Sequence, residues 1–171
     1  YKTSVYPHKA MNNTQKKFRT TKHGKKNWRK GEKLTDHEYS RHSKLIKEKF
    51  AYMISHDGKI PYEMKTKKFA QRLLPKQWKE DGPNITATSL PDDYCHFTQP
   101  RSLTVREWAR LQTFPDCYQF TGKRTTGGRR RAGDPSKGDF SRETPKYTQI
   151  GNAVPVLLAE KIGKHLHALL N

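Results

Sequence analysis

Positive charge is concentrated in the first half of this chain. Residues 1–80 contain 22 lysines and arginines against 7 acidic residues, whereas residues 81–171 contain 13 against 9. The whole chain of 171 residues has a formal charge of +19, and 32% of its residues are hydrophobic. Such a composition supports one core of ordinary domain size, or one lobe of a larger enzyme. Because so large a charge is costly in self-repulsion, it favours a polyanionic partner over a merely solvated basic surface.

Aromatic residues are interleaved with the cations of the first half, which points to nucleic acid as that polyanion. Cations can contact phosphates while aromatic rings stack on bases. The aromatic residues in question are Phe18, Trp28, Tyr39 and Phe69. Composition does not choose between DNA and RNA.

Several other classes of protein are disfavoured. The longest apolar run, residues 153–159, is far shorter than the roughly 20 residues that span a bilayer. Cys95 and Cys117 do not form a CxxC pair, so we expect reduced thiols and no metal site. We predict a cytoplasmic protein, and the absence of an initiator Met before Tyr1 favours a piece of a longer chain.

The first half contains two helix patterns and a chain break. Thr35 and Glu38 have the spacing of a capping box, and apolar residues then recur at near-helical spacing as far as Asp57, which predicts one helix. A shorter helix is predicted over residues 66–74, followed by a strand over 85–88. The turn residues at 81–84 place a boundary between residues 1–83 and 84–171.

The second half contains two further helix patterns around a basic loop. Thr104 and Glu107 form another capping box, which opens a helix that must end near Pro115. Residues 122–145 are predicted to form a long basic loop. A last amphipathic helix is predicted from about Ala153 to Leu169, with Pro155 in its first turn.

Two long motifs stand in this half, RSLTVREWARLQTFPD at residues 101–116 and YTQIGNAVPV at residues 147–156. The first resembles the ninth block of the cytosine-5 DNA methyltransferases, and the second resembles their tenth and last block. The run from Asn84 to Arg101 is similar to the segment that leads into the ninth block, although the family often has Thr where Asn84 stands. Both runs occur in the family's order.

The resemblance implies an α+β fold. Residues 1–83 would be most of a small mixed target-recognition domain, and the C-terminal helices of residues 84–171 would pack on a Rossmann-like α/β methyltransferase lobe. It also implies that Asn152, Ala153 and Val154 lie against S-adenosylmethionine, where a Gly–Asn helix start suits a polar ligand or a helix cap. In the ninth block, Arg106, Glu107 and Arg110 are expected to form structural ion pairs. Candidate DNA contacts are Thr86, Arg124, Arg129 and Arg130.

The catalytic blocks of that family have no counterpart here. The family's nucleophile lies in Pro-Cys-Gln, whereas the two cysteines here stand in Tyr94-Cys95-His96 and Asp116-Cys117-Tyr118. The implied reaction is attack of a thiolate on C6 of a cytosine extruded from duplex DNA of a bacterial nucleoid, followed by methyl transfer to C5. This chain would supply recognition and part of the cofactor pocket, and it would not supply the nucleophile.

Two arrangements would supply the nucleophile. The chain is either one subunit of a split restriction-modification methyltransferase, whose partner is the catalytic subunit, or a fragment of a single-chain enzyme. Two rival functions stay open: a non-catalytic DNA-binding module derived from a methyltransferase, and a basic RNA-binding protein of ribosomal type. The second rival leaves the ninth and tenth blocks unexplained.

Overall fold

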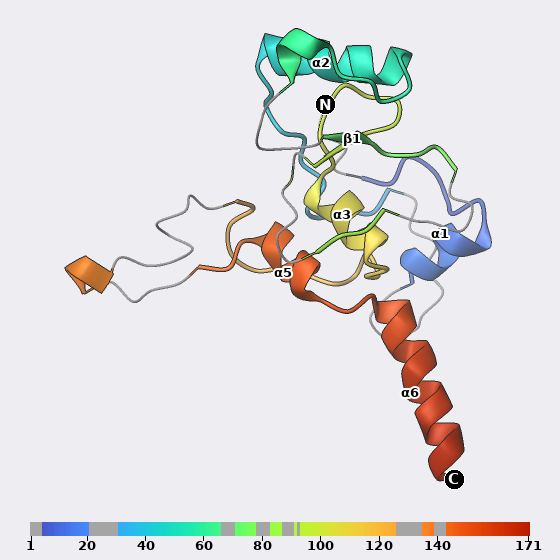
Figure 1. The fold of residues 1–171 in the computed structure, drawn as a ribbon. Helices are drawn as coiled ribbons and strands as arrows, with labels where there is room; N and C mark the ends of the chain where they lie inside the picture. The colour runs from blue at the N-terminus through green and yellow to red at the C-terminus, as the bar shows by residue number, and fades with distance from the viewer. Residues whose placement is uncertain are drawn as a thin grey trace.

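The computed structural model describes residues 5–20, 31–65, 71–77, 83–86, 91, 93–125, 135–138 and 143–171. Its elements in chain order are α1 (Asn13–Phe18), α2 (Lys44–Ser55), the 3-10 helix η1 (Tyr62–Met64), β1 (Arg72–Leu73), β2 (Tyr94–Cys95), α3 (Val105–Leu111), the 3-10 helix η2 (Pro135–Lys137), α5 (Lys146–Asn152) and α6 (Val156–Leu170). Figure 1 shows α2 at one end of the body, α3 and α5 near its centre, and α6 projecting from the other end. The chain thus combines helices with a small sheet.

The central helix α3 is specified by its own sequence. The Thr104 hydroxyl accepts a hydrogen bond from the backbone N–H of Glu107 at 3.1 Å, and the Glu107 carboxylate accepts one from the backbone N–H of Thr104 at 2.9 Å. This reciprocal pair satisfies two donors that a helix start otherwise leaves unpaired. The predicted capping box is therefore confirmed.

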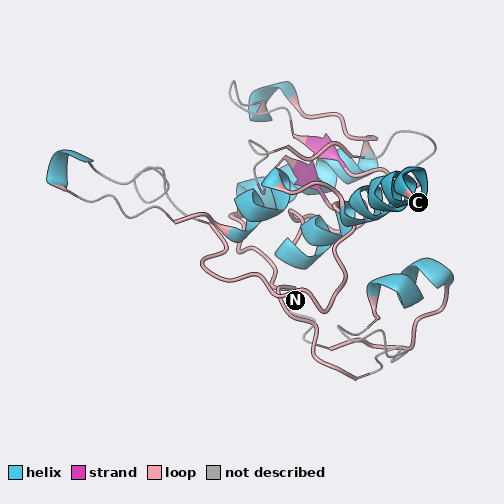
Figure 2. Cartoon of the chain, turned by 90° about the horizontal axis from the view of Figure 1, so that it is seen from below, coloured by secondary structure: helices cyan, strands magenta, loops and turns pink. Residues whose placement is uncertain are grey.

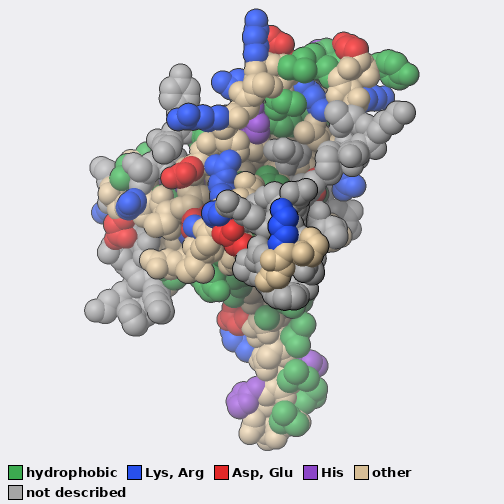
Figure 3. All heavy atoms as spheres, turned by 90° about the vertical axis from the view of Figure 1, so that its left-hand side faces the viewer, with side chains coloured by type: hydrophobic (Ala, Val, Ile, Leu, Met, Phe, Trp, Pro, Cys, Tyr) green, Lys and Arg blue, Asp and Glu red, His purple; other side chains and the backbone are tan. Residues whose placement is uncertain are grey.

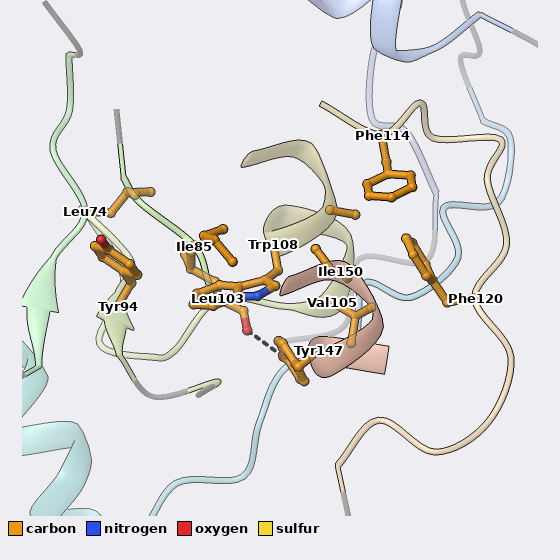
Figure 4. Close-up of a cluster of buried hydrophobic side chains, with 11 residues drawn as sticks. Leu74, Ile85, Tyr94, Leu103, Val105, Trp108, Phe114, Phe120, Tyr147 and Ile150 are labelled. Atoms are coloured by element: carbon orange, nitrogen blue, oxygen red, sulfur yellow. Dashed lines mark hydrogen bonds between the residues drawn. The ribbon is translucent and has the colours of Figure 1, made fainter. Parts of the chain in front are cut away.

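The main core is built around Trp108, whose side chain is completely buried. Helix α5 packs against α3 here, and the rings of Trp108 and Tyr147 meet nearly edge to face with centroids 5.9 Å apart. The Tyr147 hydroxyl donates to the carbonyl oxygen of Leu103 at 2.7 Å (Figure 4). Other buried apolar side chains of this core include Leu74, Ile85, Tyr94, Val105, Phe114, Phe120 and Ile150.

Two short strands connect this core to α2. Strands β1 and β2 are parallel, with Arg72 opposite Tyr94 and Leu73 opposite Cys95, and they lie between the helices (Figure 2). Cys95 packs with Phe50 and Met53 of α2 in a second apolar cluster. Because Tyr94 belongs to the main core and Cys95 to this second cluster, the strand joins the two.

Helix α6 contributes no buried residue to either core. The side chains of Leu158, Ile162 and Leu166 are each about half exposed, at 49%, 49% and 52%. Figure 3 shows apolar side chains along one side of this projecting helix. No helix among the described residues is both long and apolar enough to cross a membrane.

The long helix predicted from the Thr35–Glu38 capping box is wrong at its start. Helix α2 begins at Lys44, where the Ser43 side chain accepts from the backbone N–H of Ile46. Residues 37–43 contain no helix or strand, and Asp36 has a positive φ of 60°. This segment instead makes hydrogen bonds to the ninth block, so tertiary contacts outweigh the local signal.

Three other predicted elements also differ from the structure. Within the predicted helix 66–74, residues 72–73 form β1, and residues 66–70 are outside the described ranges. Residues 85–86 of the predicted strand have no regular structure, and residues 87–88 are not described. The last helix begins at Val156 with Pro155 as its N-cap, and a separate helix, α5, precedes it.

The predicted basic loop over residues 122–145 includes the single-turn helix η2, which stands well away from the body (Figure 2). Residues 126–134 and 139–142 of this loop lie outside the described ranges.

Candidate functional site

The ninth block forms a layer of charged groups around α3, beginning with Arg101 and Glu107. The two terminal nitrogens of the Arg101 guanidinium donate to the two carboxylate oxygens of Glu107, each at 2.7 Å. Burial alone would raise the pKa of Glu107, but the hydrogen bonds and charge of Arg101 outweigh burial and lower this pKa to about 2. The pair is thus fully ionised near neutral pH.

His96 lies beside this pair, with its Nε2 3.8 Å from the Glu107 carboxylate. Its Nδ1 accepts a hydrogen bond from the backbone N–H of Thr98 at 3.2 Å. Burial lowers the pKa of His96 to about 4, and the positive charge of Arg101 adds to that shift. His96 is therefore neutral at neutral pH.

Arg106 connects the ninth block to the N-terminal half. Its side chain is completely buried, and it donates to the carbonyl oxygens of Thr35 at 3.2 Å, Pro115 at 3.2 Å and Tyr118 at 2.8 Å. One guanidinium nitrogen also lies 3.5 Å from the Asp36 carboxylate. Burial lowers the pKa of Arg106, while the charges of Asp116 and Asp36 oppose the shift. A buried cation with this many acceptors acts as a fixed structural centre.

Arg110 and Asp116 form a third ionic contact at the other end of α3. Arg110 donates to both Asp116 oxygens, at 2.9 and 2.7 Å, and the Tyr6 hydroxyl donates to the same carboxylate at 2.5 Å. The Asp116 side chain is fully buried, so these donors replace the water that an exposed carboxylate would bind. Arg106, Glu107 and Arg110 thus all form the ion pairs expected of them.

The end of α3 is joined directly to the tenth block. The side-chain amide of Gln112 donates to the carbonyl oxygens of Ile150 at 3.4 Å and Ala153 at 3.2 Å, and its backbone carbonyl accepts from the N–H of Val156 at 3.2 Å. The Thr113 hydroxyl accepts from the backbone N–H of Leu157 at 2.9 Å. These four bonds fix the backbone around residues 152–154.

Comparison with known proteins places this arrangement in a family. The model of the C-5 cytosine-specific DNA methylases matches residues 2–168 of the chain. The chain belongs to this family. The match covers the basic N-terminal half as well as the ninth and tenth blocks, so both halves are methylase sequence.

Individual methylases differ in how much of their length corresponds to this chain. It is 32% identical over 167 residues to the Type II methyltransferase M.DdeI of Desulfomicrobium norvegicum, covering 96% of this chain and 33% of that protein. It is 39% identical over 95 residues to M.Eco47II of Escherichia coli, covering 53% of this chain and 18% of that protein. For M.AquIB of Picosynechococcus sp. the identity is 34% over 132 residues, covering 77% of this chain and 86% of that protein. The chain therefore spans a third or less of M.DdeI and M.Eco47II, and most of M.AquIB.

The three residues expected at the methylase cofactor lie at the end of α5 and in the short segment before α6. Asn152 is the last residue of α5, so the expectation that it starts or caps the last helix is wrong. Asn152 and Val154 are exposed, and Ala153 is partly buried. Their backbone is held by Gln112 and Thr113.

The candidate DNA contacts do not form one group in the structure. Arg124 donates to the carbonyl oxygen of Glu38 at 3.1 Å and to the Ser40 hydroxyl at 2.5 Å, so it holds the 38–40 segment. Thr86 is exposed on a segment without regular structure. Arg129 and Arg130 lie outside the described residues.

Sequence reasoning missed the polar residues that join distant segments. The His42 ring accepts a hydrogen bond from the backbone N–H of Ser102 at 3.1 Å, and the Asp36 carboxylate accepts one from the amine of Lys146 at 2.6 Å. No local pattern marks these pairs, because their partners are 60 and 110 residues away in the chain. Gln112 and Thr113, by contrast, stand inside the quoted ninth block, where polar residues at a helix end are typical of caps.

Proposed function

We propose that this chain is the target-recognition part of a DNA cytosine-5 methyltransferase and completes its cofactor pocket. Residues 1–83 would provide most of the recognition surface, and residues 84–171 would return to the catalytic lobe. The thiolate that attacks C6 of the extruded cytosine would come from a Pro-Cys-Gln block outside this sequence, and the reaction would serve restriction-modification. The methyl group would come from S-adenosylmethionine.

The observation that carries this proposal is the unpartnered apolar side of α6. Leu158, Ile162 and Leu166 are spaced four residues apart, so they lie on one side of the helix, and each leaves about half of its side chain in water. An apolar side of this kind on a helix signals a missing partner surface. An α/β catalytic lobe would bury it, at a gain of about 1 kcal/mol for each half-exposed side chain.

The cysteines of the chain support a nucleophile located elsewhere. The Cys95 thiol is completely buried, and burial raises its pKa to about 11. A thiol with so high a pKa is protonated at neutral pH and is a poor nucleophile. Cys117 is partly buried and lies beside Asp116, whose carboxylate is already occupied by Arg110 and Tyr6.

The exposed residues between α5 and α6 fit one wall of a cofactor pocket. The Asn152 amide can both donate and accept hydrogen bonds, and the apolar residue Val154, two positions later, is 60% exposed. Such a pair suits a ligand with polar and apolar parts, as S-adenosylmethionine has. Gln112 and Thr113 would keep this wall in place while the remaining walls come from the catalytic lobe.

The relatives support both arrangements of the whole enzyme. M.AquIB is a methyltransferase chain similar in size to this one, which favours a separate subunit. M.DdeI is about three times as long as the part that matches this chain, which favours a single-chain enzyme. In either arrangement the recognition part must meet a catalytic part.

The test is transfer of a labelled methyl group from S-adenosylmethionine to mixed-sequence duplex DNA. It uses this chain alone, and the chain mixed with a catalytic half that has the Pro-Cys-Gln block. We expect activity only in the mixture, and a loss of at least about 10-fold for the double variant Ile162→Gln, Leu166→Gln, which removes apolar surface from α6. Activity of the chain alone would overturn the inference that the nucleophile lies outside this sequence. Inactivity of the mixture, with DNA binding intact, would instead indicate a non-catalytic DNA-binding module.

A further inference from the structure

A cleft opens where the start of α2 meets the turn before α3. Its volume is about 610 Å³, and its lining residues are Tyr39, Ser40, His42, Lys47, Gln99, Pro100 and Arg101. Ligand sites in proteins commonly have volumes of roughly 300–1,000 Å³, so the cleft can hold a group of nucleotide size.

The floor of the cleft is held by hydrogen bonds, and its buried arginine is paired with a carboxylate. Arg101 is 6% exposed, is paired with Glu107 through two hydrogen bonds, and lies over the Tyr39 ring at 4.1 Å from its centroid. His42 is fixed to Ser102, and its ring meets Phe50 edge to face. Because its charge is already balanced by Glu107, Arg101 holds its neighbours in place and is not itself a phosphate ligand.

Arg101 also determines which way the Gln99 amide points. The Arg101 Nε donates to the Gln99 Oε1 at 2.5 Å. A guanidinium can only donate, so the amide atom facing it must be the oxygen. The Gln99 side chain is otherwise exposed, and within the described ranges its amide nitrogen makes no hydrogen bond. Gln99 therefore offers the cleft the two N–H groups of its amide, while one lone pair of its oxygen is occupied by Arg101.

The rim of the cleft has a cation, Lys47, on a positively charged segment. Residues 39–47 contain Arg41, Lys44 and Lys47, all exposed, and no acidic residue; Lys47 lines the cleft, and Arg41 lies between the lining residues Ser40 and His42 in the chain. Lys44 lies 3.9 Å from Glu48 in an open pair that solvent screens strongly. The peptide groups at the start of α2 add to the positive potential. Arg124 donates to Ser40 and adds a further cation to this side.

We propose that this cleft binds one nucleotide unit of the target DNA, with Lys47 and Arg41 at its phosphates and the Gln99 amide nitrogen donating to an acceptor on its base. This rests on the proposed function, which supplies DNA as the partner. The two amide N–H donors favour base edges that present acceptors, of which guanine, with N7 and O6, offers two. Gln99 is thus assigned as a specificity-determining residue and Lys47 and Arg41 as sequence-independent contacts.

Binding of the chain itself to DNA tests the rim. With mixed-sequence duplex DNA, Arg41→Ala and Lys47→Ala are each expected to weaken affinity about 5-fold and to reduce the slope of log affinity against log salt by roughly 0.9 for each phosphate that is no longer neutralised. Lys59→Ala is the matched control, because Lys59 is an exposed cation beyond the other end of α2. Equal effects of Lys59→Ala and Lys47→Ala would overturn the rim assignment. The assignment of DNA as the occupant would be overturned if structured RNA bound as tightly as duplex DNA and if the same substitutions weakened that binding.

The reconstituted enzyme tests Gln99. A random-sequence DNA library methylated by the mixture with the catalytic half and read by bisulfite sequencing gives the target site. Gln99→Leu is expected to relax one guanine position of that site about 5-fold and leave the other positions unchanged, whereas Gln119→Leu, at another exposed glutamine, leaves the whole site intact. An unchanged site for Gln99→Leu would overturn the assignment while leaving the proposed function standing. If the mixture does not methylate at all, the proposed function fails. The binding measurements then still show whether the rim cations contact DNA phosphates.

Discussion

Helices α3 and α6 use their side chains in opposite ways. Helix α3 buries Trp108 and Arg106 completely and finds partners for its charged groups within the chain. Helix α6 has no buried residue and exposes a line of apolar side chains. The charged groups of the first helix are paired within this chain, whereas the apolar side of the second stays in water, where the proposed catalytic lobe would cover it. Substitutions in the two helices should therefore affect different measurements.

The largest effect on stability is expected from Arg106. Arg106→Met leaves the carbonyl oxygens of Thr35, Pro115 and Tyr118 without their buried donor and removes one of the two cations at the Asp36 carboxylate. Removing one partner of a buried ionic network typically costs about 4 kcal/mol, so the free energy of unfolding in urea should fall by that amount. Lys164→Met on α6 is the control, with an expected change below about 0.5 kcal/mol. A loss below about 1 kcal/mol for Arg106→Met would show that α3 keeps its place without this network.

The second-largest effect on stability is expected from acid, which should lower the free energy of unfolding through His96 and Glu107 beside α3. The folded-state pKa of His96 is lowered from 6.5 to about 4, so the unfolded state binds more protons between these values. Stability is then full above pH 6.5 and is lost as the pH falls towards 4, by about 3 kcal/mol. Glu107, whose pKa is lowered from 4.5 to about 2, continues the loss below pH 4.5.

Urea unfolding measured from about pH 7 to pH 4 would check this acid effect. His96→Gln keeps an acceptor for the Thr98 N–H and should reduce the slope in that range, leaving the part that comes from His37, whose pKa is also lowered by burial. His165→Gln on exposed α6 should leave the profile unchanged. A wild-type profile without any slope between pH 6.5 and about 4 would contradict the assignment.

An intermediate effect is expected at the contact between α3 and the tenth block. Gln112→Leu removes the donor to the carbonyl oxygens of Ile150 and Ala153, and unsatisfied buried acceptors cost about 2 kcal/mol. The same variant, mixed with the catalytic half, should bind S-adenosylmethionine more weakly while its affinity for DNA is unchanged. Calorimetric titration with each ligand would measure this, and equal losses for both ligands would indicate a general structural defect.

The smallest effect on stability is expected from α6. The double variant Ile162→Gln, Leu166→Gln replaces half-exposed apolar groups by good helix formers, so the free energy of unfolding of the lone chain should change by less than about 0.5 kcal/mol. Fluorescence of a hydrophobic dye should fall in the same variant, because the exposed apolar side is smaller. A large loss of stability would mean that α6 already packs against its own chain.

The parts of the fold that are predictable from sequence are those with local causes. Thr104 and Glu107 are three residues apart and cap α3 without help, so their spacing is sufficient. Thr35 and Glu38 have the same spacing, yet their segment is not helical, because Thr35 and Asp36 bond to Arg106 some 70 residues later. A local pattern cannot reveal a competitor so far away in the chain. The strands of two residues each are likewise too short to show an alternating pattern.

The candidate site was predictable only in part. The resemblance of residues 147–156 predicts a cofactor contact around Asn152, which stays a prediction, and it did not reveal the break at Pro155 that separates α5 from α6. Proline suits either the first turn or the position just before it, and the sequence alone did not distinguish them. No sequence pattern predicts the cleft lined by Gln99, because its two walls come from segments about 60 residues apart in the chain.

The Asp36 carboxylate pairs with two cations. One of its oxygens lies 3.5 Å from a guanidinium nitrogen of Arg106 in the ninth block, and the other lies 2.6 Å from the amine of Lys146 at the start of α5. One carboxylate therefore neutralises cations from two separate later segments. A hybrid enzyme that exchanges residues 1–83 for those of another methylase would keep both cations and inherit a new residue at this position. With residues 1–83 as the recognition region that we propose, such an exchange is expected to work best when the incoming region brings an acid here, so Asp36 would limit which recognition regions are interchangeable.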